Sequence, residues 1–425
     1  MTKRGAREVT RRTVLAGAAG ALAVAGTGRP GAAGDGKQNA LRTALGPYVE
    51  DGFVPGFVAA VWHEGDTVIE AAGEQAYDGA PMRPDSIFRI ASITKPITAF
   101  AALMLVEEGR LALDEPVDDL LPELADRRVL RSIDAELDDT VPAKRAITLR
   151  DLLTLRFGLG AIMVWPPEHP IQKAMQAEGF APGYKLPTVD ADAYMARLGS
   201  LPLAAQPGEA FFYDTGMHVV GVLIARATEM ALSAFLQERL FAPLGMTDTG
   251  FWVAPRDQDR LTALYLHNSE DGERVDLGQS ELPFTAPPAF ESGSGGLVST
   301  VPDYLRFARL LLGRGEIDGK RLLSAEHCDL MATDQLTAEQ RKSPNAVKIL
   351  GPNSGWGLGI AVDHGGGELG LGAGSIGWHG GYGTSAYVDP SRQLIGVLMT
   401  PRVMASPEPS PTYVKFWRAA YEIGA

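Results

Sequence analysis

Short runs rich in β-branched and aromatic residues stand near both ends of the chain. An early pair, 57–62 and 67–69, is separated by Glu64-Gly65-Asp66, which predicts a hairpin. Runs of the same kind return late in the chain and predict further strands at 359–362, 384–388 and 394–399. This distribution indicates one sheet that is built from both ends of the chain.

Between these strands, apolar residues recur at helical spacing. Ile93, Ile97, Phe100 and Met104 predict a helix that stops near Gly109, where glycine is a natural terminator. Further helices are predicted at 147–153, with Thr148 as N-cap and Asp151 at the third position, and at 217–240, 302–312 and 413–423. Residues 163–201 are rich in Pro and Gly and are expected to be irregular.

These elements predict the α+β class, with a helical lobe inserted into a sheet lobe. We expect one domain over 36–425, with the sheet lobe at about 40–115 and 290–425 and the helical lobe at about 116–289.

The first 35 residues have a different pattern from the rest and are predicted to be a leader. Several arginines precede the run 14–25, which is almost entirely Ala, Gly, Val and Leu, as in a signal peptide. Thr10-Arg11-Arg12-Thr13-Val14-Leu15 resembles a twin-arginine export signal, so we expect export by that machinery. Cleavage at 23–25 or at 31–33 is left open, and a disordered Arg-rich tail is the alternative. No later run is long enough to cross a membrane, and no cysteine follows the apolar run to carry a lipid, so no stable anchor is expected.

Composition excludes several functions. The 425 residues carry a formal net charge of -13, and no basic patch stands out, which argues against a nucleic-acid partner. Cys328 is the one cysteine, and the 7 histidines show no ligand spacing. We therefore expect neither a metal nor another cofactor.

The candidate chemistry begins with Ser92-Ile93-Thr94-Lys95 at the head of the first predicted helix. Three residues apart is about one helical turn, so the two side chains would face each other. A lysine can take the proton of a serine hydroxyl if burial pushes it toward the neutral amine. The alternative is that Ser92 caps the helix and Lys95 is a surface charge.

Two later motifs fit the same site. Tyr213, in the loop 211–216 before a predicted helix, could move the serine proton as a phenolate or as a relay with Lys95. The glycine-rich stretch 377–385 could bring a backbone N–H to an oxyanion beside that of Ser92. The alternatives are an aromatic that anchors a turn and a glycine-rich hairpin with a structural tryptophan.

The three motifs, in this order, resemble those of the serine β-lactamase and penicillin-binding protein superfamily, which carries Ser-x-x-Lys, Tyr-x-Asn and Lys-Thr-Gly. Segments 149–155, 242–250 and 295–300 are similar to connecting segments of its class C branch, which includes family VIII carboxylesterases, D-amino-acid peptidases and transacylases. The resemblance implies an antiparallel sheet flanked by helices, with the site between the sheet and a helical lobe. Thr215 occupies the place of the asparagine.

The third motif lacks its lysine and allows two registers. Trp378-His379-Gly380 resembles the esterase branch and would make the N–H of Gly381 the oxyanion donor. The register that begins at His379 and ends at Gly381 resembles D-aminopeptidases and would use the N–H of Tyr382. His379 could also serve as a triad base, but the serine–lysine pair makes that unnecessary.

The sequence therefore predicts an exported serine hydrolase with Ser92 as nucleophile, Lys95 as its activator and Tyr213 as proton shuttle. A carboxylesterase that acts on a small-molecule ester is preferred. A β-lactamase, a D-amino-acid peptidase or DD-carboxypeptidase acting on an amide, a transacylase, and an inactive sensor on the same fold are the alternatives. The oligomeric state is left open.

Overall fold

The computed structural model describes residues 32–267 and 273–425. Residues 1–31 of the predicted leader lie outside the described residues. Its last four residues, 32–35, belong to the first helix, α1 (Ala32–Glu50), which the sequence pattern had not predicted.

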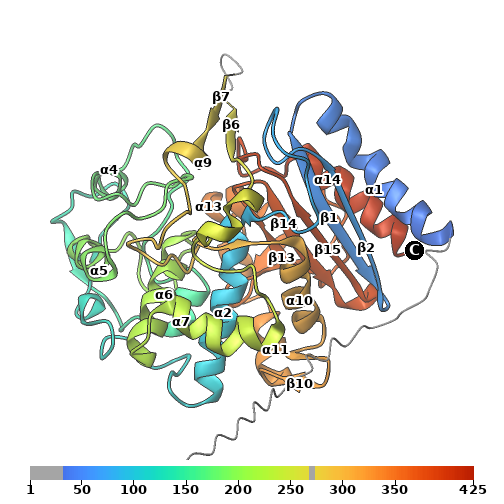
Figure 1. The fold of residues 1–425 in the computed structure, drawn as a ribbon. Coiled ribbons are helices and arrows are strands. Elements are labelled where there is room, and N and C mark those ends of the chain that lie inside the picture. The colour runs from blue at the N-terminus through green and yellow to red at the C-terminus, as the bar shows by residue number, and fades with distance from the viewer. Residues whose placement is uncertain (1–31, 268–272) are drawn as a thin grey trace, which may run out of the picture.

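A seven-stranded antiparallel sheet forms one side of the molecule (Figure 1). Its strand order is β11-β12-β13-β14-β15-β1-β2. Strand β1 lies between its hairpin partner β2 and the late strand β15, with Val58 opposite Met399. The sheet is therefore built from both ends of the chain, and the predicted hairpin is confirmed. The bounds are β1 Gly56–His63, β2 Asp66–Gly73, β11 Ser354–Trp356, β12 Ala361–Asp363, β13 Ile376–Gly380, β14 Thr384–Asp389 and β15 Leu394–Met399.

Helices cover both faces of this sheet. Helices α1 and α14 (Pro411–Ile423) lie side by side on the outer face, where Phe57 and Trp417 belong to one apolar cluster (Figure 1). Helix α10 (Val301–Leu312) packs on the inner face, and α2 (Thr94–Glu107) shares its core. The α+β class, with helices flanking an antiparallel sheet, is confirmed.

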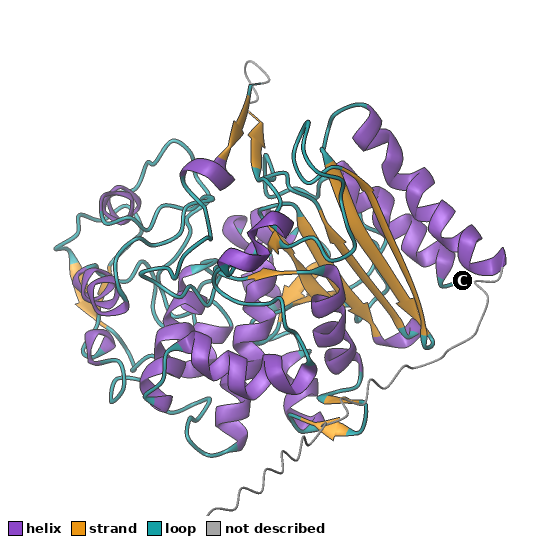
Figure 2. Ribbon diagram, in the orientation of Figure 1, coloured by secondary structure: helices purple, strands orange, loops and turns teal. Residues whose placement is uncertain are grey.

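The helical lobe lies beside the inner face (Figure 2). Its helix α3 (Leu149–Leu153) begins with the predicted capping box between Thr148 and Asp151. Two expectations were wrong. The stretch 217–240 is not one helix, because Glu229 adopts left-handed φ of 55° and ends α6 (Thr215–Thr228). The stretch 163–201 is not wholly irregular, because it holds α4 and α5. The remaining helices of the lobe are α4 Pro170–Ala177, α5 Ala191–Ser200, α7 Leu232–Leu236, α8 Ala242–Leu244 and α9 Leu277–Ser280, with the short helical turns η2 Pro122–Leu124, η3 Gln237–Phe241 and η4 Pro255–Arg260.

Short elements complete the described chain. The two-stranded pairs are β3 Phe88–Arg89 with β8 Val298–Ser299, β4 Arg128–Leu130 with β5 Thr140–Pro142, β6 Tyr265–His267 with β7 Arg274–Asp276, and β9 Glu316–Ile317 with β10 Lys320–Arg321. The other helices and turns are η1 Ala91–Ile93, α11 Ala325–Met331, α12 Ala338–Arg341, α13 Pro344–Leu350 and η5 Pro390–Arg392. In the described part of the chain, no single helix is long and apolar enough to cross a membrane, although the bent pair 215–228 and 232–244 passes by length and composition alone.

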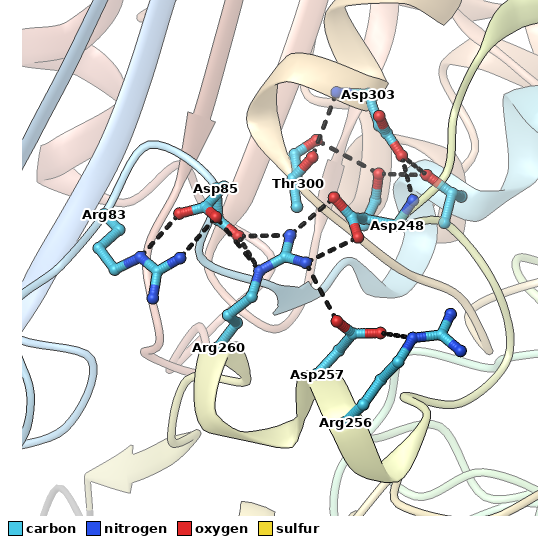
Figure 3. Close-up of polar contacts among 10 residues, drawn as sticks. Arg83, Asp85, Asp248, Arg256, Asp257, Arg260, Thr300 and Asp303 are labelled. Carbon is cyan, nitrogen blue, oxygen red and sulfur yellow. Dashed lines mark hydrogen bonds and ion pairs between the residues drawn. The ribbon is translucent and has the colours of Figure 1, made fainter. Parts of the chain in front are cut away.

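An ion-pair network joins the loop before β3, the loop after α8 and the helical turn η4 (Figure 3). Arg260 contacts the carboxylates of Asp85, Asp248 and Asp257, the Asp248 pair being 2.6 Å long. The backbone N–H of Asp248 donates to Asp303 at the start of α10. Asp85 lies just before β3, and β3 leads to the turn η1 that carries Ser92. The network therefore holds the segment of chain that leads to Ser92.

Candidate active site

Ser92 lies in the helical turn η1, directly before α2. The preceding residue, Ala91, has a φ of 45°, which is unusual for a residue other than glycine. The Ser92 hydroxyl accepts a hydrogen bond from Lys95 Nζ at 2.8 Å. No side-chain hydrogen bond caps either η1 or α2, so the interpretation of Ser92 as a helix cap was wrong.

Lys95 is completely buried, so the interpretation of this residue as a surface charge was also wrong. Its Nζ donates to Ser92 Oγ, to Asp214 Oδ1 at 2.7 Å and to the carbonyl oxygen of Ser294 at 3.0 Å. These bonds use the three donors of an ammonium group. Burial lowers the pKa of Lys95, but Asp214 and Tyr213 together outweigh burial, so the net pKa is raised. The expectation that burial makes Lys95 a neutral amine therefore fails for the resting site.

Tyr213 lies against the same lysine. Its backbone pairs with Ala161, and its ring centroid is 4.5 Å from Lys95 Nζ. The hydroxyl accepts a hydrogen bond of 2.5 Å from the indole Nε1 of Trp378. Because an indole N–H can only donate, the Tyr213 oxygen is the acceptor, and its own proton is free to point elsewhere.

The third motif lies at the end of β13 and in the turn to β14. Trp378 points to the side of Tyr213, and the next residue, His379, points to the opposite face as strand alternation requires. There, His379 contacts the hydroxyl of Ser385 at 3.1 Å and stacks on the ring of Tyr413. Burial lowers the pKa of His379 to about 3, so its imidazole is neutral. Of the two registers, only Trp378-His379-Gly380 places its first side chain beside Tyr213.

Gly380 brings this turn against the backbone that leads into Ser92. A Cβ at Gly380 would lie 2.3 Å from the carbonyl oxygen of Ile90, so only glycine fits. The hydroxyl of Thr384 donates to the same carbonyl at 2.9 Å. Gly381, which follows, is at the start of the turn, and a Cβ built on it would meet no atom within 4 Å.

Thr215, at the place of the second motif's asparagine, is buried at the start of α6. The side chain of this motif that accepts a hydrogen bond from Lys95 is that of Asp214, one position earlier. Asp214, Ser294 and His218 are site residues that the sequence interpretation missed. The signal available was an acidic residue directly after Tyr213, within the quoted motif itself.

Within the described residues, no three or more His, Cys, Asp or Glu side chains are arranged to hold a metal ion. The site thus contains the hydroxyl of Ser92, the ammonium of Lys95, the phenol of Tyr213 and the carboxylate of Asp214. Each of these groups makes a hydrogen bond to another side chain of the protein. A half-buried serine paired with a buried lysine, between an antiparallel sheet and a helical lobe, defines a serine enzyme of the β-lactamase and penicillin-binding protein type.

Comparison with known proteins agrees with this class. The family model described as Beta-lactamase matches residues 41–411. An uncharacterized protein of Mycobacterium tuberculosis (strain CDC 1551) is 39% identical over 368 residues, which cover 85% of this chain and 88% of that protein. Esterase EstB of Burkholderia gladioli is 32% identical over 366 residues, which cover 81% of this chain and 85% of the esterase.

Among solved structures, that of EstCE1, described as a hydrolase with promiscuous acyltransferase activity, superposes with a TM-score of 0.75. It is 22% identical and covers 92% of this chain and 100% of its own, which shows the shared fold. The chain belongs to the Beta-lactamase family, and it is an enzyme of the serine hydrolase and acyltransferase kind.

Proposed function

We propose that this protein is an exported carboxylesterase that acts through an acyl-enzyme on Ser92. The observation that carries the proposal is the 2.8 Å hydrogen bond between Lys95 Nζ and Ser92 Oγ, in a site where Trp378 contacts Tyr213. A nucleophile in hydrogen-bond reach of an amine that a third group orients is the arrangement that covalent catalysis requires. Lys95 acts as the base in its neutral form, which its raised pKa confines to higher pH.

The chemistry has two half-reactions. Ser92 Oγ forms a bond to the acyl carbon of the ester, and the bond from that carbon to the alcohol oxygen breaks. The serine proton passes to the Lys95–Tyr213 pair and from there to the departing alkoxide. Water then attacks the acyl carbon, and the bond from that carbon to Ser92 Oγ breaks. A water proton returns through the same pair to Ser92 Oγ, and the carboxylic acid leaves. The backbone N–H groups of Ser92 and Gly381 would bind the oxyanion in both steps.

Esters are favoured over β-lactams because of the third motif. Trp378 stands where related enzymes carry a lysine, and an indole offers no charge for a substrate carboxylate. Its aromatic ring suits an apolar acyl or alkoxy group instead. The formal net charge of -13 repels anionic substrates further, although salt screens this long-range effect.

The test compares substrates side by side on the purified protein. We expect kcat/KM for p-nitrophenyl butyrate to exceed that for nitrocefin at least about tenfold, or about 1.4 kcal/mol in the barrier. D-amino-acid anilides form the third arm, and Ser92→Ala is the control that must abolish turnover of all of them. Nitrocefin turnover equal to that of the ester would replace the esterase proposal by the β-lactamase alternative.

A further inference from the structure

Asp214 holds an unusual backbone conformation beside the reacting groups. Its φ of 80° and ψ of -63°, with the N–H of Thr215 bonded to the carbonyl of Tyr213 at 3.1 Å, define the rarer and strained form of the γ-turn. A residue other than glycine persists in such a conformation only where its surroundings hold it, and functional sites are where this occurs.

The carboxylate of Asp214 is held on both oxygens. Oδ1 accepts from Lys95 Nζ at 2.7 Å and from the hydroxyl of Ser294. Oδ2 faces His218 Nε2 at 3.2 Å, one helical turn further along α6. The strained turn therefore aims this carboxylate at the lysine, and three side chains keep it there.

His218 is itself fixed from behind. Its Nδ1 lies 3.0 Å from the hydroxyl of Ser292, and that hydroxyl oxygen accepts from the N–H of Gly295. Because an ionised carboxylate can only accept, the Nε2–H of His218 donates to Asp214, while Nδ1 on the other side of the ring meets the Ser292 hydroxyl. The rings of Tyr194 and Phe290 pack on His218, with centroids 5.6 and 5.7 Å away.

We propose that Asp214, held by His218, is the positioning residue that keeps Lys95 aligned on Ser92. Thr215, at the motif position, is not the residue that contacts Lys95. This inference rests on the proposed function, since it concerns the activation of the same serine.

The neighbours of Asp214 determine whether its carboxylate is ionised. Burial raises the pKa of Asp214, but Lys95 and His218 lower it by more, so the carboxylate is ionised. A negative charge this close favours the protonated form of Lys95, so Lys95 accepts a proton from Ser92 only at higher pH. Asp214 also raises the pKa of two other phenols, Tyr194 and Tyr382. Burial is the larger cause of the raised pKa, and both phenols are neutral.

The experiment measures the rate at which a fluorophosphonate labels Ser92 in the full chain, as a function of pH. This readout follows serine activation and needs no knowledge of the natural ester. Asp214→Asn keeps the shape and an acceptor oxygen but removes the charge, so the acidic limb of the profile should move to lower pH by about one unit or more. Asp214→Ala also removes the acceptor that holds Lys95, so its plateau rate should fall at least about tenfold below that of Asp214→Asn.

Further variants distinguish loss of the contact that positions Asp214 from disruption of the fold. His218→Gln, which can still donate to Asp214, should keep more of the plateau rate than His218→Leu. Asp318→Asn is the charge-matched control, because Asp318 is 66% exposed and pairs with Arg309 on the surface. Its profile should coincide with that of the unaltered protein, and thermal melting should show that each variant is folded.

The outcomes distinguish this inference from the proposed function. An acidic limb of Asp214→Asn at the unaltered pH overturns the inference and leaves the esterase proposal standing. A plateau for Asp214→Ala equal to that of Asp214→Asn overturns the positioning role. Absence of Ser92 labelling in the unaltered protein overturns the proposed function, and the inference falls with it.

Discussion

At the scale of single residues, the reacting groups are flanked by two strained backbone positions. Ala91 precedes Ser92 with φ of 45°, and Asp214 follows Tyr213 with φ of 80°. Conformations of this kind cost about 1–3 kcal/mol each. The hydrogen bonds around Lys95 offset part of this cost, which links the stability of the site to its catalytic arrangement.

Ser92 and Lys95 are expected to act as one unit. Ser92→Ala and Lys95→Ala should each lower kcat/KM for p-nitrophenyl butyrate by about three orders of magnitude or more. The double variant should be no worse than either single one, because the oxyanion donors and substrate binding remain in each. Lys144→Ala, at a side chain that is 73% exposed, is the control. Near-normal activity of Lys95→Ala would show that the lysine has no catalytic role.

At the scale of elements, the interface between the sheet and α14 holds a histidine with no part in the proposed chemistry. His379 on β13 is enclosed by Ser385 and Tyr387 on β14 and by Tyr413 on α14. Its neighbour on the strand, Trp378, faces Tyr213. Packing of α14 on one face therefore supports the position of the third motif on the other.

This histidine should make stability depend on pH. Its folded pKa of about 3 lies below the ordinary value of 6.5, so between these values the unfolded chain binds one more proton than the folded one. Stability is then complete above about pH 6.5 and declines as the pH falls. Urea unfolding at pH 7 and at pH 5 measures how much free energy of unfolding the protein loses between the two pH values. This loss should be about 1–2 kcal/mol smaller for His379→Phe than for the unaltered protein.

The same substitution at His364, whose side chain is 45% exposed, is the matched control for this measurement. An identical loss of stability in His379→Phe and in the unaltered protein would contradict the assignment of this pH dependence to His379.

At the scale of the whole molecule, the ends of the described chain meet on the outer side of the sheet, where α1 packs along α14. The candidate site lies on the other side, between the sheet and the helical lobe. Helix α1, at the start of the described chain, thus lies on the side of the sheet away from the candidate catalytic groups. Changes in the leader are expected to affect export and not the chemistry.

Replacement of Arg11 and Arg12 by lysine should therefore stop export while the enzyme's specific activity stays the same. The reason is that the twin-arginine pattern is recognised as an address and is not part of the fold. Cell fractionation, with activity measured in each fraction, is the measurement. Unchanged export of the double variant would exclude the twin-arginine route.

Much of this architecture is encoded locally and could be predicted from the sequence. The hairpin around Gly65 and the capping box of Thr148 and Asp151 depend on neighbouring residues, and both are confirmed. The break at Glu229 was missed, because a left-handed residue other than glycine follows from tertiary packing and leaves no strong local signal. Asp214 was missed for the same reason, because only the folded γ-turn shows where its carboxylate points.

The pairing of β1 with β15 has a consequence for how the chain folds. Val58 on β1 meets Met399 on β15, so β1, the strand next to the β2 edge of the sheet, gains its second neighbour only after nearly the whole chain has been synthesised. Until then the β1–β2 hairpin keeps one edge unpaired, and an unpaired edge is a template for association with other chains. Contacts so distant in sequence also make folding slow. The nascent chain therefore depends on protection of this edge until its last strands emerge.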